Sequence, residues 1–514
     1  MKKVLFISLI LLKVILLFAQ SDLYIVEIDT LSGNNYLTNN PIKAKVYIFP
    51  ERIDQSFIDT TRNLLTLQLR DKSRNGKRYN VFGSVLVYDL GNQIVKWSKR
   101  IKYSEFSIEQ YDNVIIKSVS YESNCLNPET GRNQWLLKNT LYYVDPYYQI
   151  GLGYKDKTTP GKSNTLEGID MITGNKIWSR TLSREYGWNN IFHLNDSVVL
   201  IVSAGLHTLN LKTGTGWDYN TITGINNTST MVAANVIGIA AGLLTGYYMY
   251  TTGPSIVRDM ASNVICSDNG IYFASKESVT HLDKNGTVRW SFPLVQNLAS
   301  SSFIFIENDL LYMINKGYAY IGDRQTKAGE PFIAAFDVHT GKNLFLNTIS
   351  DLNHINGYKV QDDDVLVISD HYILKISLTN GQLMTETAID NETYGELIDF
   401  AGNRTYDIID STYTNVASDE RWNYIVTKSG KAIVVNNSLE IVSQFDYKEL
   451  YVNYLTLKGY RFLARGTETI VIDDSDSRIA EIKSSSSAIL KGTTLYDIQG
   501  NRFVKIDLNE LLRK

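Results

Sequence analysis

The sequence predicts an all-β fold, a closed β-propeller built of four-stranded blades. Three observations predict it: a composition rich in strand-forming residues, a turn followed by an aromatic residue that recurs along the chain, and only two cysteines in 514 residues. Hydrophobic residues make up 44% of the chain, with 33 tyrosines and only 8 prolines, which is typical of an ordered chain with an ample core.

The N-terminal segment indicates export. Two lysines precede an apolar run that reaches Phe18 with one interruption, Lys13, and a small residue, Ala19, follows it. This order is that of a secretory signal peptide, so we expect residues 1–20 to be cleaved. A retained membrane anchor is the alternative, which Lys13 disfavours. The mature protein is therefore expected to be periplasmic, envelope-associated or extracellular.

The charge balance bears on possible partners. The leader contains three of the 51 basic residues, which leaves 48 against 54 acidic residues and a net charge near −6. Such a chain has no excess positive charge with which to attract polyanions. We therefore expect no nucleic-acid partner.

Cys125 and Cys266 lie about 140 residues apart. Two cysteines cannot provide a disulfide framework for an exported chain of this length. Repeats far apart in a ring rarely bring two α-carbons within the roughly 4.4 to 6.8 Å that a disulfide requires. Two buried free thiols are favoured over a bridge.

The repeated unit is a strand, a polar turn, and a second strand with an aromatic residue about eight positions after the Asp or Asn of the turn. The clearest copy runs from Asp170 through Gly174 to Trp178. The other copies, with the same spacing or one residue less, are Asp89 and Trp97, Asn127 and Trp135, Asn210 and Trp217, Asp283 and Trp290, and Asp337 and Phe345. Gly accepts the positive φ of a tight turn, and Asp or Asn can bond the backbone across it.

Each aromatic ring of the repeat needs a neighbour. An indole buries roughly 150 to 250 Å² when it is covered, and a single unit would leave it in water. Stacking the units covers the rings, and closing them into a ring leaves only short, protected strand edges. The repeat therefore predicts a propeller.

The pattern resembles the tryptophan-docking repeat of the pyrroloquinoline quinone (PQQ) propellers, the quinoprotein alcohol dehydrogenase-like family, and points to its non-catalytic BamB-like branch. The resemblance is clear over residues 80–350 and fades toward the C-terminus. For a catalytic member it would imply a calcium site, an aspartate base and usually an adjacent cysteine pair. The two cysteines of this chain are not adjacent, and no other catalytic position can be matched, so we expect no cofactor.

Blade number and domain limits follow from the turn positions. Weaker turns extend the repeat around residues 377–381, 436–437, 473–474 and 497–500. The spacing predicts eight blades, with seven or nine as alternatives. The last turn follows too soon for a full blade, so we expect a terminal strand pair that an early strand such as Leu64–Leu69 completes. The propeller is expected over 61–514, with 21–60 as an N-terminal extension containing strands.

One apolar segment breaks the repeat, an insertion at about 222–258. Residues 231–250 are long and apolar enough to span a bilayer. In a helix, small residues at every fourth position would form a contact surface, with tyrosines at one end suited to an interface. These candidate interaction residues are Ala234, Gly238, Gly242, Gly246, Tyr247 and Tyr248. Burial against the propeller, contact with a membrane or apolar partner, and self-association are the alternatives.

No pattern predicts catalytic, metal-binding or cofactor-binding residues. The acidic runs 362–364 and 473–476 lack the glycine-containing loop of an EF-hand, so solvated turns are favoured over calcium sites. A tyrosine-rich segment, 142–148, could stack on sugar rings or a peptide, with strand packing as the favoured alternative. None of the histidines has metal-ligand spacing: they are His193, His207, His281, His339, His354 and His371.

The sequence favours an exported, non-enzymatic platform that binds protein or cell-envelope components. The alternative is a cryptic quinoprotein or carbohydrate-active enzyme whose site forms in the central channel from separate blades. A channel lined with carboxylates and an amide would favour the enzyme. An uncharged or tyrosine-filled channel would favour the platform.

Overall fold

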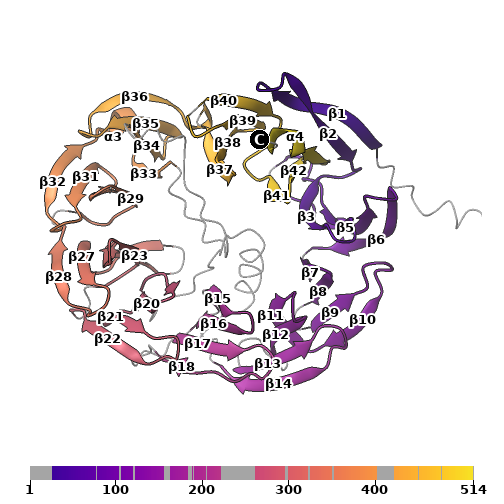
Figure 1. Cartoon of the computed structure of the whole chain (residues 1–514), viewed down its shortest axis with the longest axis horizontal. Helices are drawn as coiled ribbons and strands as arrows, with labels where there is room; N and C mark the ends of the chain where they lie inside the picture. The colour runs from indigo at the N-terminus through magenta and orange to yellow at the C-terminus, as the bar shows by residue number, and fades with distance from the viewer. Residues whose placement is uncertain are drawn as a thin grey trace, which may run out of the picture. The chain divides into compact units, whose positions relative to one another are not determined.

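The computed structural model consists almost entirely of β-strands (Figure 1). It describes residues 26–512 apart from 77, 104–105, 120–121, 156–162, 183–187, 189, 204, 221–260, 296–298, 322–323, 350–351, 402–421, 450 and 476. The chain divides into two compact units. The first comprises Met1–Phe106, Pro128–Gly131 and Leu457–Lys514, and the second comprises Ser107–Asn127 and Arg132–Thr456.

The first unit contains one four-stranded sheet, β3 to β6, and most of a nine-stranded sheet in the order β37-β38-β39-β40-β1-β2-β43-β42-β41. The strand bounds are β1 Val26–Asn35, β2 Asn40–Ile48, β3 Ile53–Asp59, β4 Leu64–Leu69, β5 Phe82–Asp89, β6 Ile94–Lys102, β37 Val452–Leu457, β38 Tyr460–Arg465, β39 Glu468–Ile472, β40 Arg478–Ile482, β41 Ile489–Lys491, β42 Thr494–Gln499 and β43 Arg502–Asp507. A short helix, α4 (Asn509–Leu512), follows β43.

The second unit contains seven four-stranded sheets, which follow one another in chain order. Its first four sheets are β7 Phe106–Tyr111, β8 Val114–Val119, β9 Glu122–Leu126 and β10 Asn133–Leu137; β11 Asn139–Asp145, β12 Ile150–Lys155, β13 Thr165–Asp170 and β14 Lys176–Thr181; β15 Asn190–Asn195, β16 Val198–Ser203, β17 Gly205–Asn210 and β18 Asp218–Tyr219; and β19 Ile265–Ser267, β20 Gly270–Ala274, β21 Ser278–Leu282 and β22 Val288–Pro293.

Its last three sheets are β23 Ser302–Glu307, β24 Leu310–Asn315, β27 Phe332–Asp337 and β28 Asn343–Thr348; β29 Gly357–Gln361, β30 Asp364–Ile368, β31 Tyr372–Ser377 and β32 Leu383–Ala388; and β33 Leu397–Phe400, β34 Trp422–Thr427, β35 Lys431–Asn436 and β36 Ile441–Asp446. Smaller elements are the hairpin of β25 (Tyr318–Ile321) and β26 (Arg324–Lys327), the helix α3 (Asn391–Tyr394) and the 3₁₀ turn η1 (Tyr447–Glu449).

These four-stranded antiparallel sheets are the blades of a β-propeller, so the predicted fold class is confirmed. In the second unit, first strands such as β23, β29 and β33 lie on the inner side, and fourth strands such as β28, β32 and β36 on the outer side (Figure 1). Eight separate four-stranded sheets occur in the described part of the chain. The nine-stranded sheet contains two further sets of four, β37 to β40 and β41-β42-β43-β2, joined by β1.

The two ends of the chain meet in that nine-stranded sheet. Strand β2 pairs with β43 from Ala44 opposite Ile506 to Ile48 opposite Arg502. The strand that completes the terminal set is therefore β2, and the expectation that Leu64–Leu69 does so is wrong. Strand β4 pairs with β3 and β5 and is buried along its whole length, as suits the second strand of a blade. The expected extension over 21–60 thus contributes β1 and β2 to this sheet and β3 to the first blade.

The repeated turns are held by side-chain caps. The Asp170 carboxylate accepts the backbone N–H groups of Ile172 and Thr173 at 2.8 and 2.9 Å. Asp89, Asn210, Asp283 and Asp337 accept two backbone N–H groups in the same way. These bonds fix the hairpin between the third and fourth strands, which determines where the following aromatic residue points.

The aromatic residue of each repeat docks on the turn of the next repeat. The Trp135 ring lies against Gly174, whose φ is +74° and whose added Cβ would come within 2.6 Å of the ring. In each tryptophan repeat the indole N–H also donates to a backbone carbonyl of the next turn, at 2.7 to 3.0 Å. The five bonds run from Trp97 to Pro128, Trp135 to Met171, Trp178 to Leu211, Trp217 to Lys284, and Trp290 to Val338. Phe345 packs on Gly381 without such a bond.

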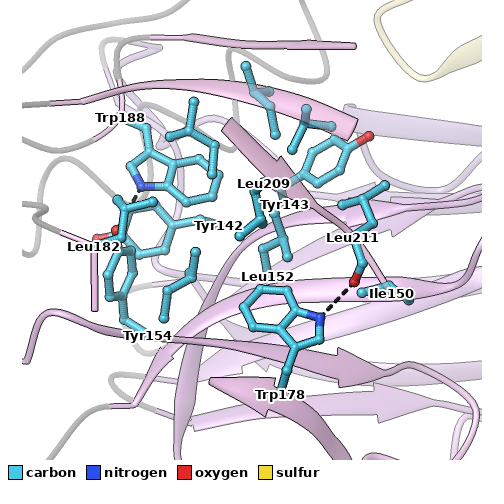
Figure 2. Packing of buried hydrophobic residues seen from close by; sticks show 14 residues of the cluster. Tyr142, Tyr143, Ile150, Leu152, Tyr154, Trp178, Leu182, Trp188, Leu209 and Leu211 are labelled. Atoms are coloured by element: carbon cyan, nitrogen blue, oxygen red, sulfur yellow. Dashed lines mark hydrogen bonds between the residues drawn. The ribbon is translucent and has the colours of Figure 1, made fainter. Parts of the chain in front are cut away.

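The core between neighbouring sheets combines these rings with aliphatic residues. Figure 2 shows one such cluster, in which the Trp178 ring and Leu152 pack beside Leu211. Trp188, which lies outside the repeat, is also buried there and donates to the Tyr154 hydroxyl at 3.1 Å. The repeat therefore explains the docked indoles, whereas Trp188 packs in this cluster without belonging to the repeat.

Candidate functional site

The sequence-predicted interaction residues, Ala234, Gly238, Gly242, Gly246, Tyr247 and Tyr248, lie outside the described residues. Among the residues that are described, no helix is long and apolar enough to cross a membrane.

Several of the histidines are held by protein partners. The His207 ring bonds Asp218 at 2.6 Å, the His281 ring lies 3.0 Å from the Asn269 carbonyl, and the His354 ring lies 3.5 Å from Asp370. No group of three or more His, Cys, Asp or Glu side chains in the described ranges could hold a metal ion. In the acidic runs, Asp364 pairs with Lys375 at 2.8 Å and Asp473 caps its own turn.

Five ionisable or hydroxyl side chains gather on the first strands of three successive sheets, β7, β11 and β15. We name them the first-strand cluster: Glu109, Tyr111, Tyr143, Asp145 and His193. The sequence does not reveal the cluster, because its members are not repeated and Tyr143 and His193 are 50 residues apart.

Glu109 is the buried acid of the cluster. The Tyr111 hydroxyl donates to its carboxylate at 2.6 Å. Burial raises the pKa of the Glu109 carboxyl to about 7, and the hydrogen bond from Tyr111 opposes that rise. Burial, with Glu109 and then Tyr143 nearby, raises the pKa of the Tyr111 phenol well above its usual value. Glu109 can therefore exchange a proton near neutral pH while Tyr111 stays protonated.

His193 is the exposed member of the cluster, with 37% of its side chain accessible. Its Nε2 lies 2.7 Å from the Tyr143 hydroxyl and 3.6 Å from the Asp145 carboxylate. The Tyr143 hydroxyl also donates to Asp145 at 3.3 Å. Tyr143 and Asp145 are buried, so His193 is where this cluster meets solvent.

The turn after β11 places aromatic side chains on the surface beside the cluster. Asp145 also accepts the backbone N–H of Tyr148 at 2.7 Å, which shapes the turn. Tyr147 is 81% exposed, and its ring contacts Tyr148 edge-on at 4.8 Å between centroids. The Lys212 ammonium, from the next blade, lies 4.2 Å from the centre of the Tyr148 ring.

A second turn of the same blade continues this surface. Met171 donates its backbone N–H to the Gln149 carbonyl at 2.9 Å, so the two turns are adjacent. The next residue, Ile172, is 69% exposed. We name the surface of Tyr147, Tyr148, Ile172 and Lys212 the tyrosine turn patch. Of the tyrosine-rich segment, Tyr142 and Tyr143 are core residues, and Tyr147 reaches solvent.

Both cysteines are free, Cys125 in β9 and Cys266 in β19. Burial raises the pKa of the Cys125 thiol to about 11 and that of the Cys266 thiol to about 12. Thiols with such pKa values are protonated at neutral pH and are poor nucleophiles.

No protein-family model matches the chain, and none of the curated proteins matches it. Solved structures that are similar to it include BamB from Moraxella catarrhalis (13% identity, 78% of this chain and 96% of that chain, TM-score 0.32) and the computationally designed Ika8 protein (11%, 72% and 95%, 0.33). Apo AztD from Citrobacter koseri is a further one (10%, 71% and 91%, 0.31). At these identities the function of none of them transfers to this chain.

Proposed function

We propose that this protein is an exported, non-enzymatic β-propeller of the PQQ-like repeat type that acts as a binding or scaffolding platform for protein or cell-envelope components. The observation that carries the proposal is the tyrosine turn patch. Two of its large side chains, Tyr147 and Ile172, project from turns that are fixed by hydrogen bonds to the blade. Exposed aromatic and aliphatic side chains on a rigid support suit a protein partner.

The experiment is site-specific photo-cross-linking of the mature protein in envelope fractions, with the photoreactive residue at position 147. We expect a discrete adduct that the variant Ile172→Ser weakens. The matched control places the same residue at position 384 in β32, where Leu383 and Met384 are 51% and 57% exposed. Equal adducts at both positions, or none at 147, would contradict the platform proposal.

Export through the leader is part of this proposal. Its test is intact-mass analysis of the protein from the producing cell. We expect a chain that begins near Ser21, after removal of residues 1–20. A chain that retains Lys13 would show instead that the segment is an anchor.

The insertion carries a second proposed contact, with a membrane or apolar partner through residues 231–250. A variant in which a short Gly/Ser linker replaces 229–252 is compared with the intact protein in membrane flotation. We expect the intact protein to float with vesicles and the variant to stay in the soluble fraction. Identical behaviour of two folded proteins would restrict binding to the blades.

One observation favours the alternative, an enzyme with its site on the first strands. Glu109 has a carboxyl pKa near neutrality because of burial, and such groups are candidate general acids. The test is a panel of glycoside substrates, together with PQQ and calcium as redox cofactors. Activity that Glu109→Gln and His193→Asn both abolish would establish the enzyme, and an inactive wild-type protein would favour the platform.

A further inference from the structure

Lys359 lies on the first strand β29 and points toward the next blade. Its ammonium group donates to the Asn423 side-chain carbonyl at 2.6 Å. Asn423, in β34, is completely buried, with an exposed fraction of 0%. The contact therefore brings a lysine amine to the buried interface between two neighbouring sheets.

The partners of Lys359 are neutral. The Asn423 side-chain N–H donates to the side-chain oxygen of Gln361 at 3.4 Å, and the Gln361 side-chain N–H donates to that of Asn437 at 3.3 Å. Within the described ranges, no carboxylate lies within ion-pair distance of Lys359. An amide chain of this kind orients the ammonium group but does not neutralise its charge.

A neighbouring lysine provides the contrast. Lys375, in β31 of the same sheet, is partly buried, as Lys359 is, and pairs with the Asp364 carboxylate at 2.8 Å. Burial lowers the pKa of the Lys359 amine, and no neighbouring charge contributes to that change. Placing a cation where water is scarce costs free energy unless an anion accompanies it. Among the described residues, Lys375 has an anion as its partner, and Lys359 does not.

We propose that Lys359 is an anion-binding residue, which takes one oxyanion group of a ligand, a carboxylate or a phosphate, between β29 and β34. The ammonium group has three N–H donors, and Asn423 takes one of them. Within the described ranges no carboxylate lies beside the other donors, and an oxyanion suits them because its bonds to an ammonium group are charge-assisted and short. This site is separate from the tyrosine turn patch, and the inference does not depend on the platform proposal.

The experiment compares the thermal midpoints of the wild type, Lys359→Met and Lys375→Met in chloride, acetate and phosphate at equal ionic strength. In chloride we expect Lys359→Met to melt at or above the wild-type temperature, because an apolar side chain of similar length replaces a cation that has no carboxylate partner among the described residues. Lys375→Met should melt below the wild type, because it leaves the Asp364 carboxylate without its partner.

The anion series identifies the ligand group. We expect a saturable rise of the midpoint, roughly 1 to 2 °C at tenfold excess over Kd, in the wild type and Lys375→Met but not in Lys359→Met. A rise with acetate alone indicates a carboxylate ligand, and a rise with phosphate alone indicates a phosphate ligand. The proposal is overturned if Lys359→Met melts below the wild type in chloride, which would reveal a counter-charge within the chain, or if all three proteins respond alike to the anions.

Discussion

The fourth strands and the first strands of the second unit follow different rules. Trp135, Trp178 and Trp290, on or beside fourth strands, each dock on a turn of the next blade and donate to a carbonyl there. Glu109 and His193, on first strands, are not part of the repeated motif. The repeated aromatic residues pack the interfaces between sheets as far as Phe345. The residues that are not part of the repeat can provide a site. Substitutions of docked residues on fourth strands should therefore change stability through packing. Substitutions on first strands should change it through hydrogen bonds and protonation.

The largest effect is expected from removing a docked indole. Trp178→Ala should lower the free energy of unfolding by about 3 to 5 kcal/mol, because it leaves a cavity and an unpaired carbonyl at Leu211. Trp217→Ala should cost about 2 kcal/mol, because Trp217 is only partly buried. Urea unfolding followed by circular dichroism measures both. Equal losses would show that docking depth does not determine stability.

The next effect concerns the buried acid on the first strands. The unfolded Glu109 carboxyl ionises near its ordinary pKa of about 4.5, whereas burial holds the folded pKa near 7. Between these values the folded state retains a proton that the unfolded state has lost, so wild-type stability should fall as the pH rises. Glu109→Gln removes this dependence and should be more stable than the wild type at pH 8 by up to about 3 kcal/mol.

The measurement is urea unfolding of the wild type and Glu109→Gln at pH 4.5 and pH 8. The two proteins should be similarly stable at the lower pH and diverge at the higher one. Glu449→Gln, at an exposed glutamate, is the control and should not diverge. A constant difference between the wild type and Glu109→Gln would mean that the carboxylate is solvated.

A pair of glycines tests the docking surface itself. Gly174 and Gly430 both have positive φ, +74° and +79°, but an added Cβ meets the Trp135 ring only at Gly174. Gly430→Ala should cost about 1 to 2 kcal/mol from backbone conformation alone. Gly174→Ala should cost at least about 1 kcal/mol more, because the ring must also move. Thermal unfolding measures the difference in stability. Equal costs would show that the contact between position 174 and the Trp135 ring does not contribute.

The smallest effect is expected from one hydroxyl of the first-strand cluster. Tyr143→Phe removes the bonds to His193 and Asp145 and should cost about 1 kcal/mol. Tyr147→Phe, on the exposed turn of the same blade, should change stability by less than about 0.5 kcal/mol. Urea unfolding at pH 7 distinguishes them. A neutral Tyr143→Phe would show that the cluster is not held by its hydrogen bonds.

In the weaker C-terminal repeats, the sequence pattern no longer predicts which residue packs against the next turn. After Phe345 no aromatic residue follows the turns at the repeat position, yet β33 to β36 still form a four-stranded sheet. Asn436 caps its turn by accepting the N–H groups of Ser438 and Glu440 at 3.0 and 2.9 Å. The turn chemistry therefore persists where the docking residue is lost, because the cap is local and the ring is not.

The sequence also leaves strand partners open. It predicts strands within the extension 21–60 and at Leu64–Leu69, and both regions form strands. Either has the β-branched and apolar residues that a terminal sheet needs, so composition does not identify the partner of β43. Pairing between strands more than 400 residues apart depends on the path of the whole chain. Only the fold shows that β2 takes this place.

By itself, the sequence determined the fold class, the repeated turn and the residues that dock between blades, because each is encoded by a short spacing that recurs. Tertiary structure alone decided which ionisable groups lie together. His193 and Lys359 take their partners from strands of neighbouring sheets. Glu109 is bonded by Tyr111 of its own strand, and the fold buries it there. Their burial and charge environment depend on strand register and on the side of the strand to which each side chain points, which no local pattern specifies.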